Sequence, residues 1–270
     1  MPVGAFNFTK FAATGSALHS YTQSWVDRVI TAGGTVSTAR QTVVDTFVNG
    51  LITDGLLNGT TIASSIIHYM NLFATESFTG CQVPLIDAKS VGNATLVNFV
   101  GADYSSSGLA GNKIDKYLNT GYIPATHTVS ASDGVACGVY SVSGAIDHLA
   151  EFGCESATTT MNVYGGSSFV GVDVYGANAS ASVSYAHGLN VGNLFGSTLR
   201  YLNDSNVRLS TSGTGTTLPD VPAYFFALNG SGSATNYTSY LIRLTLISRG
   251  LSTTHETALN SRVQTLVSSL

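Results

Sequence analysis

Charged residues are scarce in this sequence of 270 residues: Asp, Glu, Lys and Arg together make up 10%, against about a quarter in an average soluble domain. The 11 basic and 15 acidic residues leave a net charge of −4, and no basic run focuses a positive field, which excludes nucleic-acid binding. The surface must be largely hydroxyl, amide and backbone. Such a surface suits a protein that packs beside copies of itself, or one that binds sugars through hydrogen bonds.

Cysteine is scarce as well. The three thiols, Cys81, Cys137 and Cys154, are too few and too irregularly spaced for a disulfide framework or a zinc site, both of which need close paired spacings. We therefore expect buried thiols. A disulfide between Cys137 and Cys154 stays open as an alternative, since the two residues can face one another on neighbouring strands.

Long apolar runs are also missing. Residues 1–20 interrupt their apolar side chains with Asn, Lys, Thr or Gly, so they lack the continuous apolar core of a signal peptide. No later stretch reaches the roughly 18 apolar residues of a membrane span, and we expect a soluble chain made in a cytoplasm. Hydrophobic residues make up 44% of the sequence, enough for a large core, which excludes a disordered chain.

Helical periodicity appears in two places. Apolar residues spaced at i, i+3, i+4 and i+7 after Ser37 predict an amphipathic surface helix that ends near Gly55. The run 62–73 is ambiguous between helix and strand. After residue 250 the helical period returns, and Thr253 three residues before Glu256 predicts a capping box at the start of a C-terminal helix.

From about residue 78 the apolar period is two. Short segments rich in Val, Tyr, Phe and Thr predict strands at 116–122, 135–142, 168–175, 181–187, 198–202, 207–210, 223–228 and 238–248. In the last of these we expect one side of the strand to carry Tyr240, Ile242, Leu244 and Leu246. The predicted fold class is mainly β, an antiparallel two-sheet jelly-roll sandwich. We divide the chain into an N-terminal arm (1–30), a helical segment (31–75) and a sandwich with a C-terminal helix (76–270).

Several strings carry a resemblance to a known family. They are WVDRVITAGGTVS from Trp25, VPLIDAK from Val83, NFVGADY from Asn98, GLAGN from Gly108, KYLNTG from Lys116, FALNG from Phe226 and GLS from Gly250. Together they resemble concanavalin A-like (laminin G-like) jelly-roll proteins of phage structural gene clusters and bacterial genomes, which generally have no assigned activity. The resemblance covers most of residues 25–270. It implies a two-sheet sandwich with an N-terminal helical segment and a short C-terminal helix in a phage particle, and it brings no catalytic residues.

No catalytic pattern stands out. Glycoside hydrolysis needs two carboxylates about 5 to 10 Å apart, and the Glu-x-Asp-x-x-Glu string of concanavalin A-like glycosidases is missing. The nearest cluster is Asp147, His148, Glu151 and Glu155, which a polar strand or turn rim explains more simply. The six histidines include no i, i+4 pair, and no Gly-x-Ser-x-Gly string occurs. The glycines at 188, 192 and 196 are expected in turns. We expect no enzyme and no cofactor.

Two binding patterns remain. The turn at 203–206 is rich in oxygen ligands, and Asp204 and Asn206 are weak candidate ligands of a hard cation, since such a turn between two strands is also ordinary hairpin chemistry. Sugar binding needs aromatic faces beside amides and hydroxyls. The candidates in or beside Gly- and Asn-rich turns are Tyr164, Tyr175, Tyr185 and Tyr201. Tyrosine is also common in strands for packing reasons, which is the competing interpretation.

The N-terminal arm carries large aromatic residues without a regular period, namely Phe6, Phe8, Phe11, Tyr21 and Trp25. We expect these residues to form no helix or sheet of their own. Their expected role is to attach the protein to a partner or to sister subunits, and docking back onto the sandwich is the alternative.

The leading hypothesis is a non-enzymatic virion structural protein, an accessory tail, fibre or collar component whose sandwich faces outward, with host glycans as candidate ligands. A capsid decoration protein is the second hypothesis, and a carbohydrate-active enzyme or secreted lectin is the third. The expected partners are other virion proteins and copies of the same chain. We expect neither nucleic acid nor membrane insertion.

Overall fold

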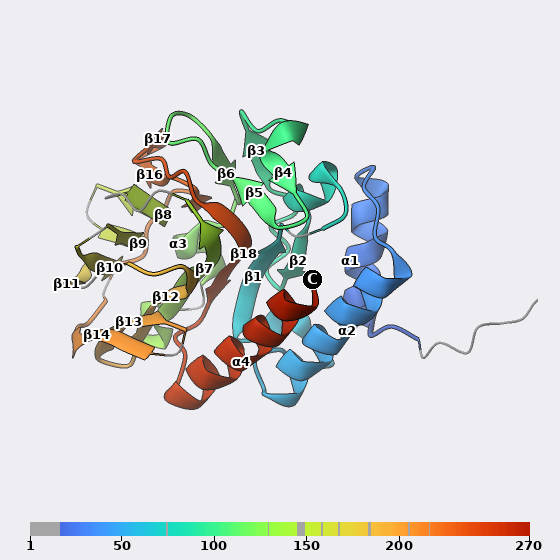
Figure 1. Cartoon of the computed structure of the whole chain (residues 1–270). Coiled ribbons are helices and arrows are strands. Elements are labelled where there is room, and N and C mark those ends of the chain that lie inside the picture. The colour runs from blue at the N-terminus through green and yellow to red at the C-terminus, as the bar shows by residue number, and fades with distance from the viewer. Residues whose placement is uncertain are drawn as a thin grey trace, which may run out of the picture.

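A computed structural model of the whole chain describes residues 17–270, apart from positions 74, 129, 145–148, 158, 167, 183–184, 205 and 216. The side chains of residues 131 and 149–151 also lie outside the description, as do the predicted attachment residues Phe6, Phe8 and Phe11. The described chain forms three layers: a group of helices, a sheet that we call sheet A, and a second sheet, sheet B (Figure 1).

Sheet A is the middle layer. Its strands lie in the order β14 (Asn206–Ser212), β13 (Thr198–Asn203), β12 (Gly188–Phe195), β7 (Val135–Ser143), β18 (Leu241–Ser248), β1 (Ile67–Leu72) and β2 (Pro84–Asp87). The short strand β5 (Gly108–Ala110) pairs with the beginning of β18, and β4 (Tyr104–Ser105) pairs with β5. The segment that was ambiguous by periodicity is thus the strand β1, fully buried between β18 and β2.

Sheet B faces sheet A. Its order is β11 (Ala177–Ala181), β10 (Val170–Val174), β9 (Thr159–Gly165), β8 (Leu149–Ser156), β15 (Tyr224–Phe225), β6 (Tyr117–Asn119) and β3 (Thr95–Val97). The strand β16 (Leu228–Gly230) lies parallel to β8 and pairs with β17 (Ser233–Thr235), whereas the other described pairs are antiparallel. The predicted fold class, a mainly β two-sheet sandwich with flanking helices, is confirmed.

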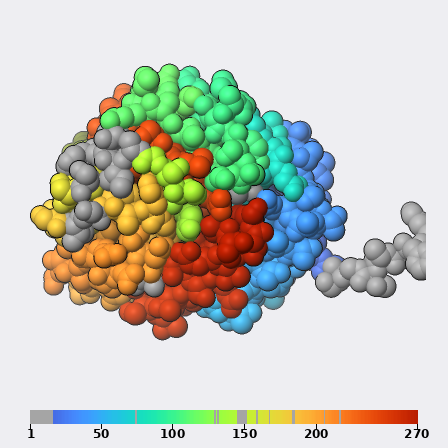
Figure 2. Space-filling view, in the orientation of Figure 1, coloured from blue at the N-terminus to red at the C-terminus, as the bar shows by residue number. Residues whose placement is uncertain are grey.

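The three long helices cover the outer face of sheet A. They are α1 (Ser20–Thr31), α2 (Thr38–Thr53) and α4 (Thr253–Ser269), while α3 (Pro124–His127) is a single turn. Figure 2 shows the surface of α4 directly beside that of the N-terminal helices, in agreement with the α2–α4 contact. None of the helices in the described part of the chain is long and apolar enough to cross a membrane.

Two apolar cores result. One lies between the sheets and includes Phe152, Val172 and Ile247. The other lies between sheet A and the helices and includes Val48 and Leu244. Sheet A therefore buries side chains on both of its faces, as a sheet covered on both sides must.

A β-bulge changes the predicted orientation of β18. The register against β7 advances by two residues on β18 and by one on β7 between Ile242 and Leu244, and such a bulge reverses the alternation of the residues that follow. Tyr240 and Ile242 consequently face sheet B, whereas Leu244 and Leu246 face the helices. The expectation that all four share one side is wrong.

Two further predictions about the strands need correction. Of the described residues in the predicted strand 181–187, only the first belongs to a strand, and Gly188 and Gly192, which were assigned to turns, lie in β12. Gly196 does lie in a turn, between β12 and β13, as predicted. At Gly192 a Cβ atom would lie 2.4 Å from Cγ2 of Val172 and 2.8 Å from Cγ2 of Val163. Glycine is therefore required here by the close approach of sheet B, and not by a turn.

The helix termini follow the predicted chemistry with one difference. Ser37 caps α2, its hydroxyl accepting from the Arg40 N–H at 3.2 Å. Ser252, and not Thr253, caps α4 by accepting from the His255 N–H at 3.3 Å. The Glu256 side chain turns inward to sheet A instead of closing a capping box, because Asn193 and Arg200 donate to it there.

The cysteines are free. Cys137 lies in β7 and Cys154 in β8, on the two facing sheets, and neither forms a disulfide. Burial raises the pKa of all three thiols, that of Cys81 to about 12. The expected buried thiols are confirmed, and the alternative Cys137–Cys154 bridge is not formed.

The end of the predicted arm is helical. Residues expected to have no regular structure form α1, whose N-terminus is capped by the His19 side chain. Trp25 is fully buried in the core between the helices and sheet A, and the Tyr21 hydroxyl donates to the Asn58 carbonyl. These two aromatic residues dock on their own chain, so Trp25 has no surface left with which to hold a partner.

Trp25→Ala is expected to lower the free energy of unfolding by about 3 to 5 kcal/mol, because it leaves a large cavity beneath α1. Chemical denaturation monitored by circular dichroism measures this change. Ile30, on the same helix and 57% exposed, provides the control, and Ile30→Ala should change the stability by less than about 0.5 kcal/mol. Equal stability of the two variants would contradict the packing described above.

Candidate functional site

The outer face of sheet B is not covered by the long helices, which all pack on sheet A. In β6 and β15, Leu118 and Phe225 point into the core between the sheets. Successive side chains of a strand point to opposite faces, so Tyr117 and Tyr224 point outward. The exposed face of the sandwich thus carries aromatic rings.

A third tyrosine joins these two. The rings of Tyr117 and Tyr224 stack with their centroids 4.6 Å apart and an interplanar angle of 28°. Tyr237, from the loop that precedes β18, lies 6.3 Å from Tyr117 at 50°, and its hydroxyl donates to the Ala234 carbonyl at 2.9 Å. We call Tyr224, Tyr117 and Tyr237 the tyrosine row. Tyr224 is only 6% exposed and supports Tyr117, while Tyr117 and Tyr237 are half-buried.

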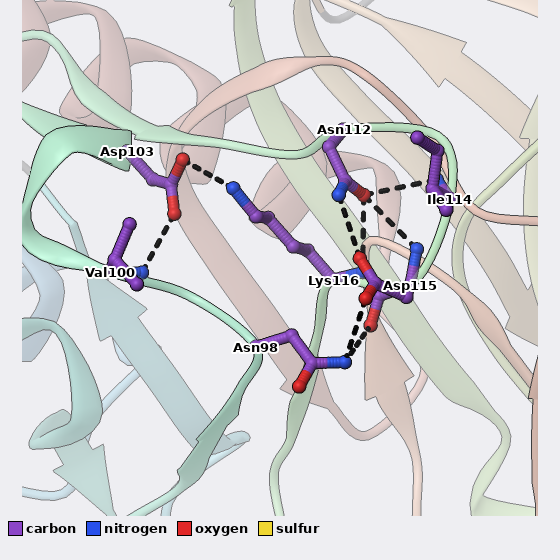
Figure 3. A network of polar contacts seen from close by, with 7 residues as sticks. All are labelled: Asn98, Val100, Asp103, Asn112, Ile114, Asp115 and Lys116. Carbon is purple, nitrogen blue, oxygen red and sulfur yellow. Dashed lines mark hydrogen bonds and ion pairs between the residues drawn. The ribbon is translucent and has the colours of Figure 1, made fainter.

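A polar loop directly precedes Tyr117 in the sequence, and Figure 3 shows the contacts within it. The Asn112 side-chain oxygen accepts from the backbone N–H groups of Asp115 at 3.1 Å and Lys116 at 3.2 Å, which fixes the turn. The Asn112 amide donates to the Asp115 carboxylate at 2.7 Å, and the Asn98 amide donates to it at 3.1 Å. Two amides therefore orient the Asp115 carboxylate.

An ion pair ties this turn to the neighbouring loop. Lys116 donates to Asp103, whose other carboxylate oxygen accepts from the Val100 N–H at 2.7 Å (Figure 3). Both charged side chains are 16% exposed. The Asp115 carboxylate is not part of this pair, and its charge acts on Tyr237 of the row.

The electrostatics of the row are consistent with this arrangement. Burial raises the pKa of Tyr237, and Tyr117 and the Asp115 carboxylate raise it further. Burial also raises the pKa of Tyr224, with Tyr117 adding to the effect. The row therefore presents neutral phenols beside amides and one carboxylate, a combination that suits hydroxyl-rich ligands with apolar faces.

Most of the tyrosines chosen from the sequence lie elsewhere. Tyr175, Tyr185 and Tyr201 are 1%, 3% and 1% exposed in the core between the sheets. Their rings are packed, as shown by the stacking of Tyr185 on Tyr240 at 5.1 Å, so no sugar can stack on them. Only Tyr164 points outward from sheet B, where it packs beside Phe169 in the region of β9.

Of the two predicted cation ligands, Asp204 is engaged by protein groups. The Asp204 carboxylate accepts from the Leu189 N–H at 2.8 Å and from Gln264 of α4 at 2.7 Å. Asn206 is exposed and donates weakly to the Asp204 carbonyl at 3.4 Å. Over the described residues, no three His, Cys, Asp or Glu side chains are grouped as metal ligands would be. Asp204 thus ties α4 to the β13–β14 turn.

Of the acidic cluster, Asp147, His148 and the Glu151 side chain lie outside the described residues, and Glu155 is exposed on β8.

Elsewhere a serine contacts a histidine, with 3.2 Å between Ser141 Oγ and His187 Nδ1. Ser141 is only 1% exposed, and its hydroxyl also contacts the Tyr185 hydroxyl at 2.6 Å. Ser141 therefore belongs to a buried polar network, with the half-buried His187 at its edge.

The chain has no match among family models, and no curated protein matches it. Solved structures resemble parts of it. The K499G mutant of NanB sialidase from Streptococcus pneumoniae aligns with 53% of this chain at 11% identity and a TM-score of 0.39, over 26% of the sialidase. This chain thus spans about a quarter of that enzyme.

Smaller domains align over nearly their whole length. Domain 4 of AbnA, a GH43 extracellular arabinanase from Geobacillus stearothermophilus solved with arabinotriose, is 10% identical and has a TM-score of 0.46, with 72% of this chain and 97% of that domain aligned. The CBM40 of the Ruminococcus gnavus IT-sialidase is 13% identical and has a TM-score of 0.40, with 56% and 96% aligned. These likenesses concern the fold alone.

One buried histidine gives the fold a pH dependence. His68 is fully buried, its Nδ1 lies 2.9 Å from the Tyr122 hydroxyl, and burial lowers its pKa to about 3. The unfolded state binds a proton below about pH 6.5, whereas the folded state binds it only near pH 3. This contribution to stability is therefore complete above pH 6.5 and is lost as the pH falls towards 3.

We expect the free energy of unfolding to fall with acidification in this window by up to about 1.4 kcal/mol per pH unit from His68. Denaturant titrations at several pH values measure the slope. His68→Gln removes the titrating group and should flatten the slope relative to the parent protein. An unchanged slope in that variant would show that other groups cause the acid sensitivity.

Proposed function

We propose that this chain is a non-catalytic carbohydrate-binding sandwich that holds a glycan on the tyrosine row. The gathering of Tyr224, Tyr117 and Tyr237 on the uncovered face of sheet B carries the proposal. Sugar rings have apolar C–H faces that pack on aromatic rings, and hydroxyl edges that need amide and carboxylate partners. Asp115, oriented by two amides, supplies such a partner beside the rings.

The low charge of the chain supports a neutral glycan as the ligand. A binding surface made of phenols, amides and one carboxylate has no field with which to attract a polyanion. Its affinity must come from ring contact and from short hydrogen bonds. A linear polysaccharide can contact Tyr117 and Tyr237 with successive sugar units.

The biological setting is a further part of the proposal. The resemblance to proteins of phage structural gene clusters supports a virion component, an accessory tail, fibre or collar protein that presents the glycan-binding face outward. A capsid decoration protein and a secreted lectin are the alternatives with the same binding surface. Immunogold labelling of purified phage particles distinguishes these assignments by the position of the label. Particles that carry no label would favour the secreted lectin.

Tyr117→Ala and Tyr237→Ala are each expected to weaken glycan binding by roughly ten-fold or more, equivalent to about 1.4 kcal/mol. A glycan array identifies the ligand, and isothermal titration calorimetry compares the variants. Tyr164→Ala is the matched control, because it removes an outward tyrosine from another part of sheet B. Equal losses in all three variants, or an array without any ligand, would rule out the tyrosine row.

The protein should release no reducing ends from the glycan that it binds. Incubation of the purified chain with that glycan, followed by a reducing-sugar assay, tests this expectation. Turnover that disappears in Glu155→Gln, the described member of the acidic cluster, would show instead that the chain is an enzyme.

A further inference from the structure

A second polar feature lies along α1, on the opposite side of sheet A from sheet B (Figure 1). An open hollow of about 670 Å³ adjoins a second hollow of about 370 Å³. Ser20, Ser24 and Arg28 line both of them. These three residues lie on one side of α1, since positions four apart on a helix are neighbours.

Arg28 stands out in this hollow. Its side chain is half-buried, and burial lowers its pKa. Among the residues that the structure describes, none forms a hydrogen bond or an ion pair with its guanidinium group. A partly desolvated cation without a partner is costly, and the five N–H donors of arginine suit a planar anion.

The nearby acids are already engaged. Both carboxylate oxygens of Asp87 accept backbone N–H groups, from Val91 at 2.8 Å and from Gly92 at 2.9 Å. Asp27 accepts from Gln23 at 2.8 Å. Asp87 acts on Arg28 through its charge without a hydrogen bond. Residues 1–16, which precede α1 in the sequence, contain no Asp or Glu that could pair with Arg28.

We propose that this hollow binds a saccharide that carries a carboxylate, with Arg28 holding the carboxylate. A carboxylate can accept two parallel N–H bonds from a guanidinium group. The hydroxyls of Ser20 and Ser24 and the amide of Asn93 line the same hollow and match the sugar hydroxyls. Asp27 and Asp87 make a singly charged ligand a better fit than a doubly charged phosphate.

Titration of the full chain with D-glucuronate, followed by NMR of the backbone amides of α1 and of the Arg28 Nε–H group, tests the proposal. Saturable shifts of both sets of signals are expected. D-glucose and acetate each carry half of the recognised chemistry and should bind at least ten-fold more weakly. Raising the salt concentration should weaken glucuronate binding, because an ion pair at an open hollow is screened.

Arg28→Gln should abolish the glucuronate shifts, and Arg28→Lys should retain weak binding because it keeps the charge and loses the two-pronged donor. Tyr117→Ala should leave them unchanged, which separates this site from the tyrosine row. Arg28→Gln should melt at or above the temperature of the parent, since it removes an unpaired, half-buried charge.

Asn93→Ala should weaken glucuronate binding several-fold. Because position 93 is exposed, this variant keeps the proposal testable even if Arg28→Gln fails to fold. The proposal is overturned by the lack of any shift with glucuronate, by shifts that persist in Arg28→Gln, or by equal binding of glucuronate and glucose. Equal binding of acetate and glucuronate would also overturn it, since the hydroxyls would then have no role.

Discussion

Sheet A carries apolar side chains on both of its faces. The helices are needed to cover one face and sheet B to cover the other. Outward residues such as Leu244 and Leu246 would be exposed to water without α1, α2 and α4, at a cost of roughly 1.5 to 3 kcal/mol for each large side chain. Inward residues such as Ile242 and Ile247 need sheet B in the same way. The bulge in β18 divides the apolar residues of one strand between the two cores.

The few charged residues serve largely to position the helix layer. Glu256 is buried in α4 and accepts from Asn193 of β12 at 2.5 Å and from Arg200 of β13 at 2.8 Å. Asn193 also accepts from the Leu251 N–H at 2.9 Å, which fixes the chain just before α4 begins. Arg262 pairs with Asp54 and joins α4 to the end of α2. Such buried or half-buried pairs define geometry more than they add stability.

The sequence predicted the regular elements better than the contacts between them. The helix at Thr38–Thr53 and the terminal helix follow from apolar spacing and hydroxyl caps, which are local signals. The strand β12 was missed because glycine is common in turns, and the need for Gly192 arises from Val172, a residue twenty positions away on the other sheet. The bulge at Arg243 was missed for the same reason, since it is a property of the pairing with β7.

The same limit applies to the site. Tyr164, Tyr175, Tyr185 and Tyr201 were selected by their neighbours in the sequence, but burial depends on which way a strand faces. The tyrosine row combines residues 117, 224 and 237 from three separate segments: the pairing of β6 with β15 brings Tyr117 and Tyr224 together, and the loop before β18 adds Tyr237. The alternation of side chains along a strand was the one available signal for the row. Tyr117 and Tyr224 each precede a large apolar residue that points inward, so each tyrosine must point outward.

The layered structure also determines where a ligand can bind. Sheet A is closed on both faces, so recognition is left to the outer face of sheet B and to the outer surfaces of the helices. The two surfaces differ in kind: the tyrosine row offers ring faces and oriented amides, whereas the α1 hollow offers one unpaired cation among hydroxyls. Ring contact depends little on ionic strength. An ion pair in an open hollow weakens as salt is added, because it is exposed to the counterions of a solution whose Debye length is about 10 Å at 0.1 M salt. If both proposals hold, binding at the tyrosine row should therefore be insensitive to salt, whereas binding in the α1 hollow should weaken as salt is added.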